Sequence, residues 1–204
     1  MDDWLNNWKK YFKPIPVGER LLIRPVWEEA FDPQGRAVLN LEPGLAFGTG
    51  AHETTRLCLE LIERYLAPGG AVLDMGCGSG ILSVAALLLG AGSAVGVDID
   101  PLAVKTAKEN ARLNGVEARF TGLCGNLADK VSGQYQLIAA NIVADVVIEL
   151  TRDVPRFLAP GGVYIISGII DAREADVLAA LAGRYTVIER REDRGWVAMA
   201  LRAC

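Results

Sequence analysis

The stretch Leu73-Asp74-Met75-Gly76-Cys77-Gly78-Ser79-Gly80 decides the fold of this chain, because it places three glycines between an apolar run and a helix-like apolar segment. Glycines allow the backbone to turn sharply and to approach a ligand closely. A tight strand-to-helix turn without a ligand would account for the same pattern. Positions elsewhere in the chain are therefore needed to decide between the two interpretations.

Strand-like and helix-like segments alternate on both sides of this turn. Apolar spacing predicts a helix from about Glu53 to Leu66, which stops at Pro68-Gly69-Gly70. After it we expect strand Ala71–Met75, helix Ser79–Leu89, strand Ala94–Val97, helix Pro101–Asn114, strands Ala118–Thr121 and Gln136–Ala140, helix Val143–Leu158, strand Val163–Ser167, helix Ala172–Ala182, and strands Thr186–Arg190 and Trp196–Leu201. This alternation of strands and helices predicts an α/β fold. We expect a parallel sheet that is covered by helices on both faces and ends in an antiparallel hairpin.

Two of these helices carry clear end signals. Asp100 is suited to the N-cap of the helix that begins at Pro101, and Gly115 follows directly after its end. Pro155 falls inside the predicted helix Val143–Leu158 and is expected to kink that helix or to end it early.

The first forty residues have a different character. Trp4–Lys13 is an aromatic and basic segment of a kind typical of linkers and interfaces. The apolar runs Leu21–Trp27 and Ala37–Leu41 flank the turn sequence Asp32-Pro33-Gln34-Gly35, which predicts a β-hairpin. We therefore expect an extension of linker helix and β-hairpin over residues 1–41, followed by the main domain over residues 42–204.

Composition narrows the class of protein. With 204 residues, 51% of them hydrophobic, the chain can bury one substantial core, and its formal charge of −4 provides no overall field for binding nucleic acid. The chain has four cysteines without C-x-x-C spacing: Cys58, Cys77, Cys124 and Cys204. Since His52 is the only histidine, we expect no metal site. Without a signal peptide or a membrane-length apolar run, the chain is expected to be cytoplasmic with reduced thiols.

A dinucleotide-dependent dehydrogenase is the main enzymatic alternative for the glycine turn. Its G-x-G-x-x-G/A pattern needs a small residue at the position that Ile81 occupies here, so that helix and strand can pack closely. The third glycine instead comes one residue early, at Gly80, which gives G-x-G-x-G. This turn resembles the nucleoside-binding loop of class I methyltransferases.

Two carboxylates accompany the turn. Asp98 ends an apolar strand 22 residues after Gly76, where a carboxylate can accept both hydrogen bonds of a ribose diol; capping the next helix is the alternative role, which Asp100 already fills. Asp74 is a candidate for contacting a methionine ammonium, directly or through water. Its alternative role is to organise the loop.

Asn141 ends the predicted fourth parallel strand, in the sequence Ile138–Ala144. Ligands of open α/β sheets bind outside the carboxyl ends of the strands, where the strand order reverses. Gly76, Asp98 and Asn141 are therefore expected to share one rim of the sheet. The uncharged amide of Asn141 can accept a hydrogen bond from an attacking amine, which makes it the candidate catalytic residue; a strand-end turn residue is the alternative.

The segment Phe47-Gly48-Thr49-Gly50-Ala51-His52-Glu53-Thr54-Thr55 leads into the first predicted helix. Hydroxyl and N–H groups at a helix N-terminus suit a carboxylate such as that of a methionine moiety, and Thr55 is the candidate for this contact. N-capping by Thr54 or Thr55 would need no ligand. His52 beside a helix start is interpreted as a local hydrogen-bonding residue, with general-base catalysis as the less favoured alternative.

Taken together, these residues resemble one family, the methyltransferases of large-subunit ribosomal protein L11, of the PrmA type. The motifs that carry the resemblance are Leu45-Ala46-Phe47-Gly48-Thr49-Gly50-Ala51-His52-Glu53-Thr54-Thr55, Asp74-Met75-Gly76-Cys77-Gly78-Ser79-Gly80-Ile81-Leu82, Gly96-Val97-Asp98-Ile99-Asp100-Pro101 and Ala140-Asn141-Ile142-Val143-Ala144. The second and third are shared by class I methyltransferases in general, whereas the first and last are much narrower.

The resemblance implies a Rossmann-like, doubly wound sheet of seven strands and S-adenosyl-L-methionine as the cofactor. It implies cofactor contacts at Thr55, Gly76, Asp98 and Asn141. The glycine turn and its neighbouring carboxylate add Asp74, Gly78 and Gly80 as candidate cofactor-binding residues. Such enzymes methylate lysine side chains and the N-terminal α-amine of L11. We expect a monomer that contacts neither nucleic acid nor membrane.

The chain departs from the family pattern in one respect. Members of the family normally carry a further N-terminal domain that docks L11 and is joined to the catalytic domain by a linker like Trp4–Pro16. This chain begins at that linker. We expect either a truncated form or a natural short form. Two other functions remain open at this stage: methylation of another protein, a small molecule or RNA, and a non-catalytic module that binds the cofactor and interacts through Trp4–Lys13.

Overall fold

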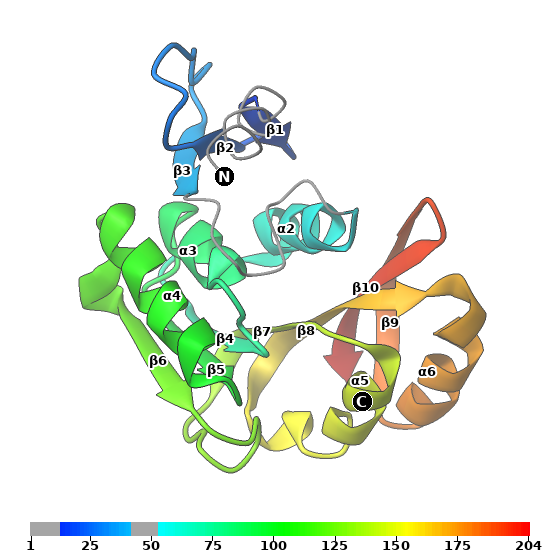
Figure 1. Cartoon of the computed structure of the whole chain (residues 1–204). Helices are drawn as coiled ribbons and strands as arrows, with labels where there is room; N and C mark the ends of the chain where they lie inside the picture. The colour runs from blue at the N-terminus through cyan, green and yellow to red at the C-terminus, as the bar shows by residue number, and fades with distance from the viewer. Residues whose placement is uncertain (1–12, 42–52) are drawn as a thin grey trace, which may run out of the picture.

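The computed structural model describes residues 13–41 and 53–204, in which a seven-stranded sheet forms the centre of the domain (Figure 1). Its strands are β4 (Ala71–Met75), β5 (Ser93–Asp98), β6 (Phe120–Cys124), β7 (Tyr135–Asn141), β8 (Leu158–Ile170), β9 (Tyr185–Asp193) and β10 (Trp196–Ala203). They lie in the order β6-β5-β4-β7-β8-β10-β9. The first five of that order pair in parallel, and β10 pairs antiparallel with both β8 and β9. The predicted doubly wound sheet and its closing hairpin are confirmed.

Helices cover both faces of this sheet, as its alternating side chains require. They are α2 (Glu53–Tyr65), α3 (Ile81–Leu88), α4 (Pro101–Leu113), α5 (Ala144–Leu150) and α6 (Glu174–Leu181). Val72 of β4 belongs to the core under α2 and α3, whereas its neighbour Leu73 belongs to the core under α5 and α6. The strand order reverses between β4 and β7, and the glycine turn leaves β4 at that point.

Local end signals were reliable guides. The Asp100 side chain accepts a hydrogen bond from the N–H of Leu102 (2.9 Å), and Gly115 has a φ of 68° just after α4, as predicted. The helix predicted over Val143–Leu158 is wrong in length. It ends at Leu150, and Pro155 lies in a separate 3₁₀ turn (Val154–Arg156), because proline cannot continue the helical hydrogen bonding.

The predicted β-hairpin in the extension is wrong. A small sheet is present, with β1 (Ile15–Val17), β2 (Leu21–Pro25) and β3 (Ala37–Leu41) in that order, but β2 and β3 run parallel with Leu21 opposite Ala37. The antiparallel partner of β2 is β1. The expected turn does form, since the Asp32 carboxylate accepts from the N–H of Gln34 (2.9 Å).

The physical reason for this difference is burial. The connection of residues 26–36 returns the chain to the starting end of β2, so that β3 begins opposite Leu21 and runs alongside β2. Leu39 and Leu41 then join Ile23 in the core shared with α2 and α3. Turn residues show where a chain reverses, but the apolar face that becomes buried decides the direction of pairing. The predicted linker helix and the residues Trp4–Phe12 lie outside the described part of the chain.

Candidate functional site

A cavity of about 550 Å³ lies at the carboxyl ends of the strands, beside the reversal of strand order. Such a volume is within the range of pockets for small molecules, roughly 300–1,000 Å³. Its lining residues are Thr54, Gly76, Asp98, Ile99, Asn126, Leu127, Asn141, Ile142, Val143, Val146, Glu149, Gly168 and Trp196. The structure therefore brings Gly76, Asp98 and Asn141 together on one cavity, whereas Thr55, Asp74, Gly78 and Gly80 lie outside its lining.

The backbone of the glycine turn forms part of the cavity wall. The N–H groups of Gly76 and Cys77 both donate to the carbonyl of Val97 on β5 (2.8 and 3.0 Å). Gly76 has a φ of 71°, and a Cβ at this position would lie 2.6 Å from Cγ2 of Ile142. Glycine is required here both by the left-handed backbone and by the packing of the next cavity residue.

The carboxylate of Asp98 is held in one orientation by two backbone donors. Its Oδ2 accepts from the N–H of Gly78 (2.9 Å) and its Oδ1 accepts from the N–H of Asp100 (3.0 Å). Each carboxylate oxygen can accept more than one hydrogen bond, so both oxygens retain capacity for a pair of hydroxyl groups. The cap of α4 is supplied by Asp100, which leaves Asp98 to face the cavity.

Asp74 lies behind the wall, with 1% of its surface exposed. Its Oδ2 accepts from the N–H (3.2 Å) and the hydroxyl (2.7 Å) of Ser83, while its Oδ1 is buried without a hydrogen-bond partner. Burial raises the pKa of Asp74 to about 6, the Ser83 hydrogen bonds oppose this rise, and the charge of Asp98 adds to it. Asp74 thus organises the start of α3 through its Oδ2, whereas its Oδ1 remains available as a hydrogen-bond acceptor.

A hydrogen bond connects Asn141, in the cavity lining, to Thr55 outside it. Asn141 Nδ2 donates to Thr55 Oγ1 (3.2 Å), and Thr55 is fully buried in the first turn of α2. Thr54, not Thr55, lines the cavity, and its carbonyl accepts from the hydroxyl of Ser167 on β8 (2.8 Å). The predicted contact of Thr55 with a carboxylate stays a prediction. The other predicted residues of this segment, Phe47 to His52, lie outside the described residues.

Several cavity residues were missed by the sequence reasoning. Ile99 directly follows Asp98 and is 71% exposed, and Asn126 and Leu127 follow the end of β6. Their location was predictable from the sequence, because β6 is also a parallel strand whose carboxyl end meets the same edge of the sheet. Trp196 begins β10 and reaches the cavity only because that strand runs antiparallel to β8, which no local pattern reveals.

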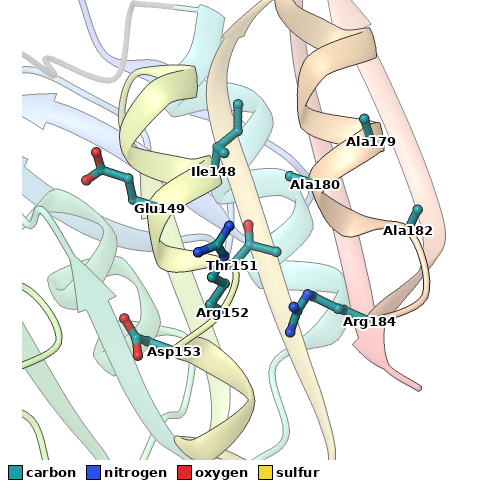
Figure 2. A pocket seen from close by; sticks show the side chains of 9 residues that line it. All are labelled: Ile148, Glu149, Thr151, Arg152, Asp153, Ala179, Ala180, Ala182 and Arg184. Atoms are coloured by element: carbon teal, nitrogen blue, oxygen red, sulfur yellow. The ribbon is translucent and has the colours of Figure 1, made fainter.

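A second cavity, of about 600 Å³, lies between the ends of α5 and α6 (Figure 2). It is lined by Ile148, Glu149, Thr151, Arg152, Asp153, Ala179, Ala180, Ala182 and Arg184. Arg152 and Arg184 follow the C-terminal ends of the two helices, where cations complement the helix dipoles. Among residues 13–41 and 53–204, no group of His, Cys, Asp and Glu side chains is placed to hold a metal ion.

Comparisons with known proteins agree with this geometry. Residues 1–203 match the family model described as ribosomal protein L11 methyltransferase (PrmA). A ribosomal protein L11 methyltransferase from Pelotomaculum thermopropionicum is 50% identical over 98% of this chain and 66% of that protein, and one from Caldanaerobacter subterraneus is 43% identical over 98% and 65%. The chain thus spans slightly less than two thirds of the length of these relatives.

A solved structure shows the same similarity. The crystal structure of a ribosomal protein L11 methylase from Lactobacillus delbrueckii subsp. bulgaricus superposes with a TM-score of 0.88 at 33% identity. The match covers 94% of this chain and 99% of the other. The overall arrangement described above is therefore shared over nearly the whole length of both chains.

Proposed function

Since the chain belongs to the ribosomal protein L11 methyltransferase (PrmA) family, we propose that it transfers methyl groups from S-adenosyl-L-methionine to amines of ribosomal protein L11. One observation carries this proposal: Gly76, Asp98 and Asn141 meet on a single cavity at the reversal of strand order. We propose lysine side chains and the N-terminal α-amine as acceptors, as the family resemblance implies.

The residues around the cavity fit this cofactor. Asp98 is oriented to accept two ribose hydroxyls, and Gly76 lets the ligand approach the backbone. Asp74 lies outside the cavity lining, and we propose that a water molecule connects its unpartnered Oδ1 to the methionine ammonium. When bound, the cofactor supplies a methyl group activated by a sulfonium. We propose Thr55, Gly78 and Gly80 as supporting residues that orient Asn141, Asp98 and the turn.

Asn141 orients the acceptor amine in this proposal. Because its Nδ2 donates to Thr55, its Oδ1 is the atom that can accept a hydrogen bond from the amine. An amide cannot take up the proton, and a free lysine has a pKa near 10.4, so the amine loses its proton to water before it attacks. Alignment alone can lower the barrier by about 7–11 kcal/mol. The methyl-transfer rate is therefore expected to rise with pH.

We propose that the enzyme acts in the cytoplasm as a monomer and contacts neither nucleic acid nor membrane; the formal charge of −4 supports the absence of nucleic-acid binding. We also propose the division into an extension over residues 1–41 and a main domain over residues 42–204. Within the described ranges, no helix is long and apolar enough to cross a membrane.

The proposal is tested by incubating the chain with radiolabelled S-adenosyl-L-methionine and purified L11, and by locating the label with peptide mass spectrometry. We expect label on L11 amines and formation of S-adenosylhomocysteine. Asp98→Ala should lose activity, whereas Arg152→Ala, in the second cavity, should retain it. Label in RNA instead of L11, or cofactor binding with no product on any amine, would contradict the proposal.

A further inference from the structure

The N-terminal sheet is connected to the α4 helix by a paired hydrogen bond. The N–H of Asn40 on β3 donates to Asn114 Oδ1 (2.7 Å), and Asn114 Nδ2 donates to the carbonyl of Asn40 (2.9 Å). A neighbouring strand would satisfy the backbone of Asn40 with the same donor and acceptor pattern. The Asn114 side chain thus occupies the edge of β3 and joins the sheet to the end of α4.

One turn earlier on α4, Asn110 contacts the glycine turn. Asn110 is buried, and its Nδ2 donates to the carbonyl of Ser79 (2.8 Å). Ser79 precedes Gly80, the N-cap of α3, so its carbonyl lies outside the hydrogen bonding of that helix. Asn114 Nδ2 also donates to the carbonyl of Asn110 (2.9 Å). A continuous series of hydrogen bonds therefore runs from β3 to the glycine turn.

The same face of α4 also packs against the turn. A Cβ at Gly80 would lie 2.8 Å from Cβ of Ala107, which is three residues before Asn110. Residues three, four and seven apart lie on one side of a helix. Ala107, Asn110 and Asn114 consequently form one surface that holds both the turn and the sheet.

The sheet itself is anchored to the helices that flank the turn. The Glu63 carboxylate on α2 accepts from the N–H groups of Glu19 (2.8 Å) and Arg20 (3.1 Å). Arg20 Nη2 donates to the carbonyl of Leu89, the C-cap of α3 (2.9 Å). A displacement of the sheet would thus act on α2, α3 and α4 together.

We propose that Asn110 is a positioning residue of the cofactor site, and that Asn114 lets the N-terminal sheet set the conformation of the glycine turn. The inference rests on the proposed function, because it assigns the turn to cofactor binding. The N-terminal sheet would then contribute to cofactor binding. The packing of this sheet against α2, α3 and α4 and the affinity for the cofactor would be coupled.

The test compares Asn110→Ala and Asn114→Ala with the parent chain by calorimetric titration of S-adenosyl-L-methionine and by steady-state kinetics. We expect the Kd and the KM for the cofactor to rise roughly fivefold or more, the lower range of coupling between sites. The kcat at saturating cofactor should stay near that of the parent. A merely structural role would lower the melting temperature without this separation of KM from kcat.

Thr151→Val is the matched control. It removes a buried hydrogen bond, from the Thr151 hydroxyl to the carbonyl of Val147 (2.8 Å), at the end of α5, whose buried residues belong to a different core cluster from those of α3. We expect it to lower the melting temperature and to leave the Kd unchanged. A parental Kd in Asn110→Ala or Asn114→Ala would overturn the inference. If Asn110→Ala does not fold, Asn110→Leu replaces it, because leucine has a similar shape, carries no donor and adds no buried charge.

Hydrogen exchange of the Gly80 amide gives a readout that does not depend on the cofactor. This N–H donates to the carbonyl of Cys77 within the turn (2.8 Å). We expect faster exchange in Asn114→Ala and no change in Thr151→Val. Absence of cofactor binding in the parent chain would refute the proposed function, whereas unchanged exchange in Asn114→Ala would refute the link between sheet and turn.

Discussion

Asn141 Nδ2 donates a hydrogen bond to Thr55 Oγ1 over 3.2 Å, which connects the end of β7 to the first turn of α2 although the two residues are 86 positions apart. This bond determines which end of the amide faces the cavity. It makes Thr55, a buried residue outside the cavity lining, a partner of the proposed catalytic group.

Thr55→Val should lower the kcat of methyl transfer. The nearly isosteric side chain preserves packing but removes the acceptor for Asn141 Nδ2, and one lost hydrogen bond corresponds to a decrease of roughly three- to tenfold. Steady-state kinetics with L11 as the varied substrate measures the effect. Thr55→Ser keeps the hydroxyl and serves as the control. Equal rates for the valine and serine variants would show that the bond does not orient Asn141.

Asn141→Ala and Asp98→Ala should impair different steps, the methyl transfer in the first variant and the binding of the cofactor in the second. Asn141→Ala is expected to lower kcat by about tenfold or more while cofactor binding persists, because it removes the group that aligns the amine. Asp98→Ala should chiefly raise the Kd of the cofactor, because it removes the carboxylate that accepts the ribose hydroxyls. Calorimetry and single-turnover rates separate the two effects. Full activity in both variants would reject the assignment of the site.

Asp74→Asn should change how stability depends on pH. The pKa of Asp74 is raised by burial from 3.8 to about 6, so the folded chain binds this proton more tightly than the unfolded chain does. The free energy of unfolding therefore falls as pH rises from about 4 to 6, and the ionised group costs about 3 kcal/mol at pH 7.

Urea denaturation of parent and Asp74→Asn at several pH values between 4 and 7 checks this expectation. The difference between the two chains isolates Asp74 from carboxylates such as Glu174 and Glu189, whose pKa values are lowered by arginine partners and hydrogen bonds despite partial burial. Relative to the parent, the variant should gain stability as the pH rises. A constant difference across this range would contradict the prediction.

Gly76→Ala should destabilise the chain more than Gly35→Ala. Both glycines have a positive φ, 71° and 73°, which costs an alanine about 1–2 kcal/mol. Only at Gly76 would the added Cβ also meet Ile142, whereas Gly35 has no atom within 4 Å of that position. Urea denaturation of the two variants compares the costs. Equal losses of stability would mean that the Ile142 side chain moves away from the added Cβ without a measurable cost in free energy.

The four cysteines should separate into two classes with a thiol reagent at pH 8. Cys124 and Cys204 are exposed and should react in the folded chain, whereas Cys58 and Cys77 are buried. Burial raises the pKa of the Cys58 and Cys77 thiols far above the ordinary value, which suppresses the reactive thiolate. Spectrophotometric titration before and after unfolding counts the two classes. Rapid reaction of all four thiols in the folded chain would contradict this burial.

Local sequence predicted much of the fold because its causes act over a few residues. The strand predicted at Ala71–Met75 was observed with those bounds, since its apolar run ends at a glycine turn. The start of α4 followed from Asp100 and Pro101, and the premature end of α5 from Pro155. The shared rim of Gly76, Asp98 and Asn141 also followed, because parallel strands bring their carboxyl ends to one edge.

Tertiary structure alone decided the relationships between distant segments. The sequence by itself determined the alternating elements, the glycine turn and the candidates at the strand ends, all of which depend on spacing along the chain. Three other features depend on which surfaces become buried together: the parallel pairing of β2 with β3, the Asp74 Oδ1 atom without a hydrogen-bond partner, and the hydrogen bonds between Asn40 and Asn114. Burial is a property of the packed chain, and for that reason the residues that support the site became visible only in the folded structure.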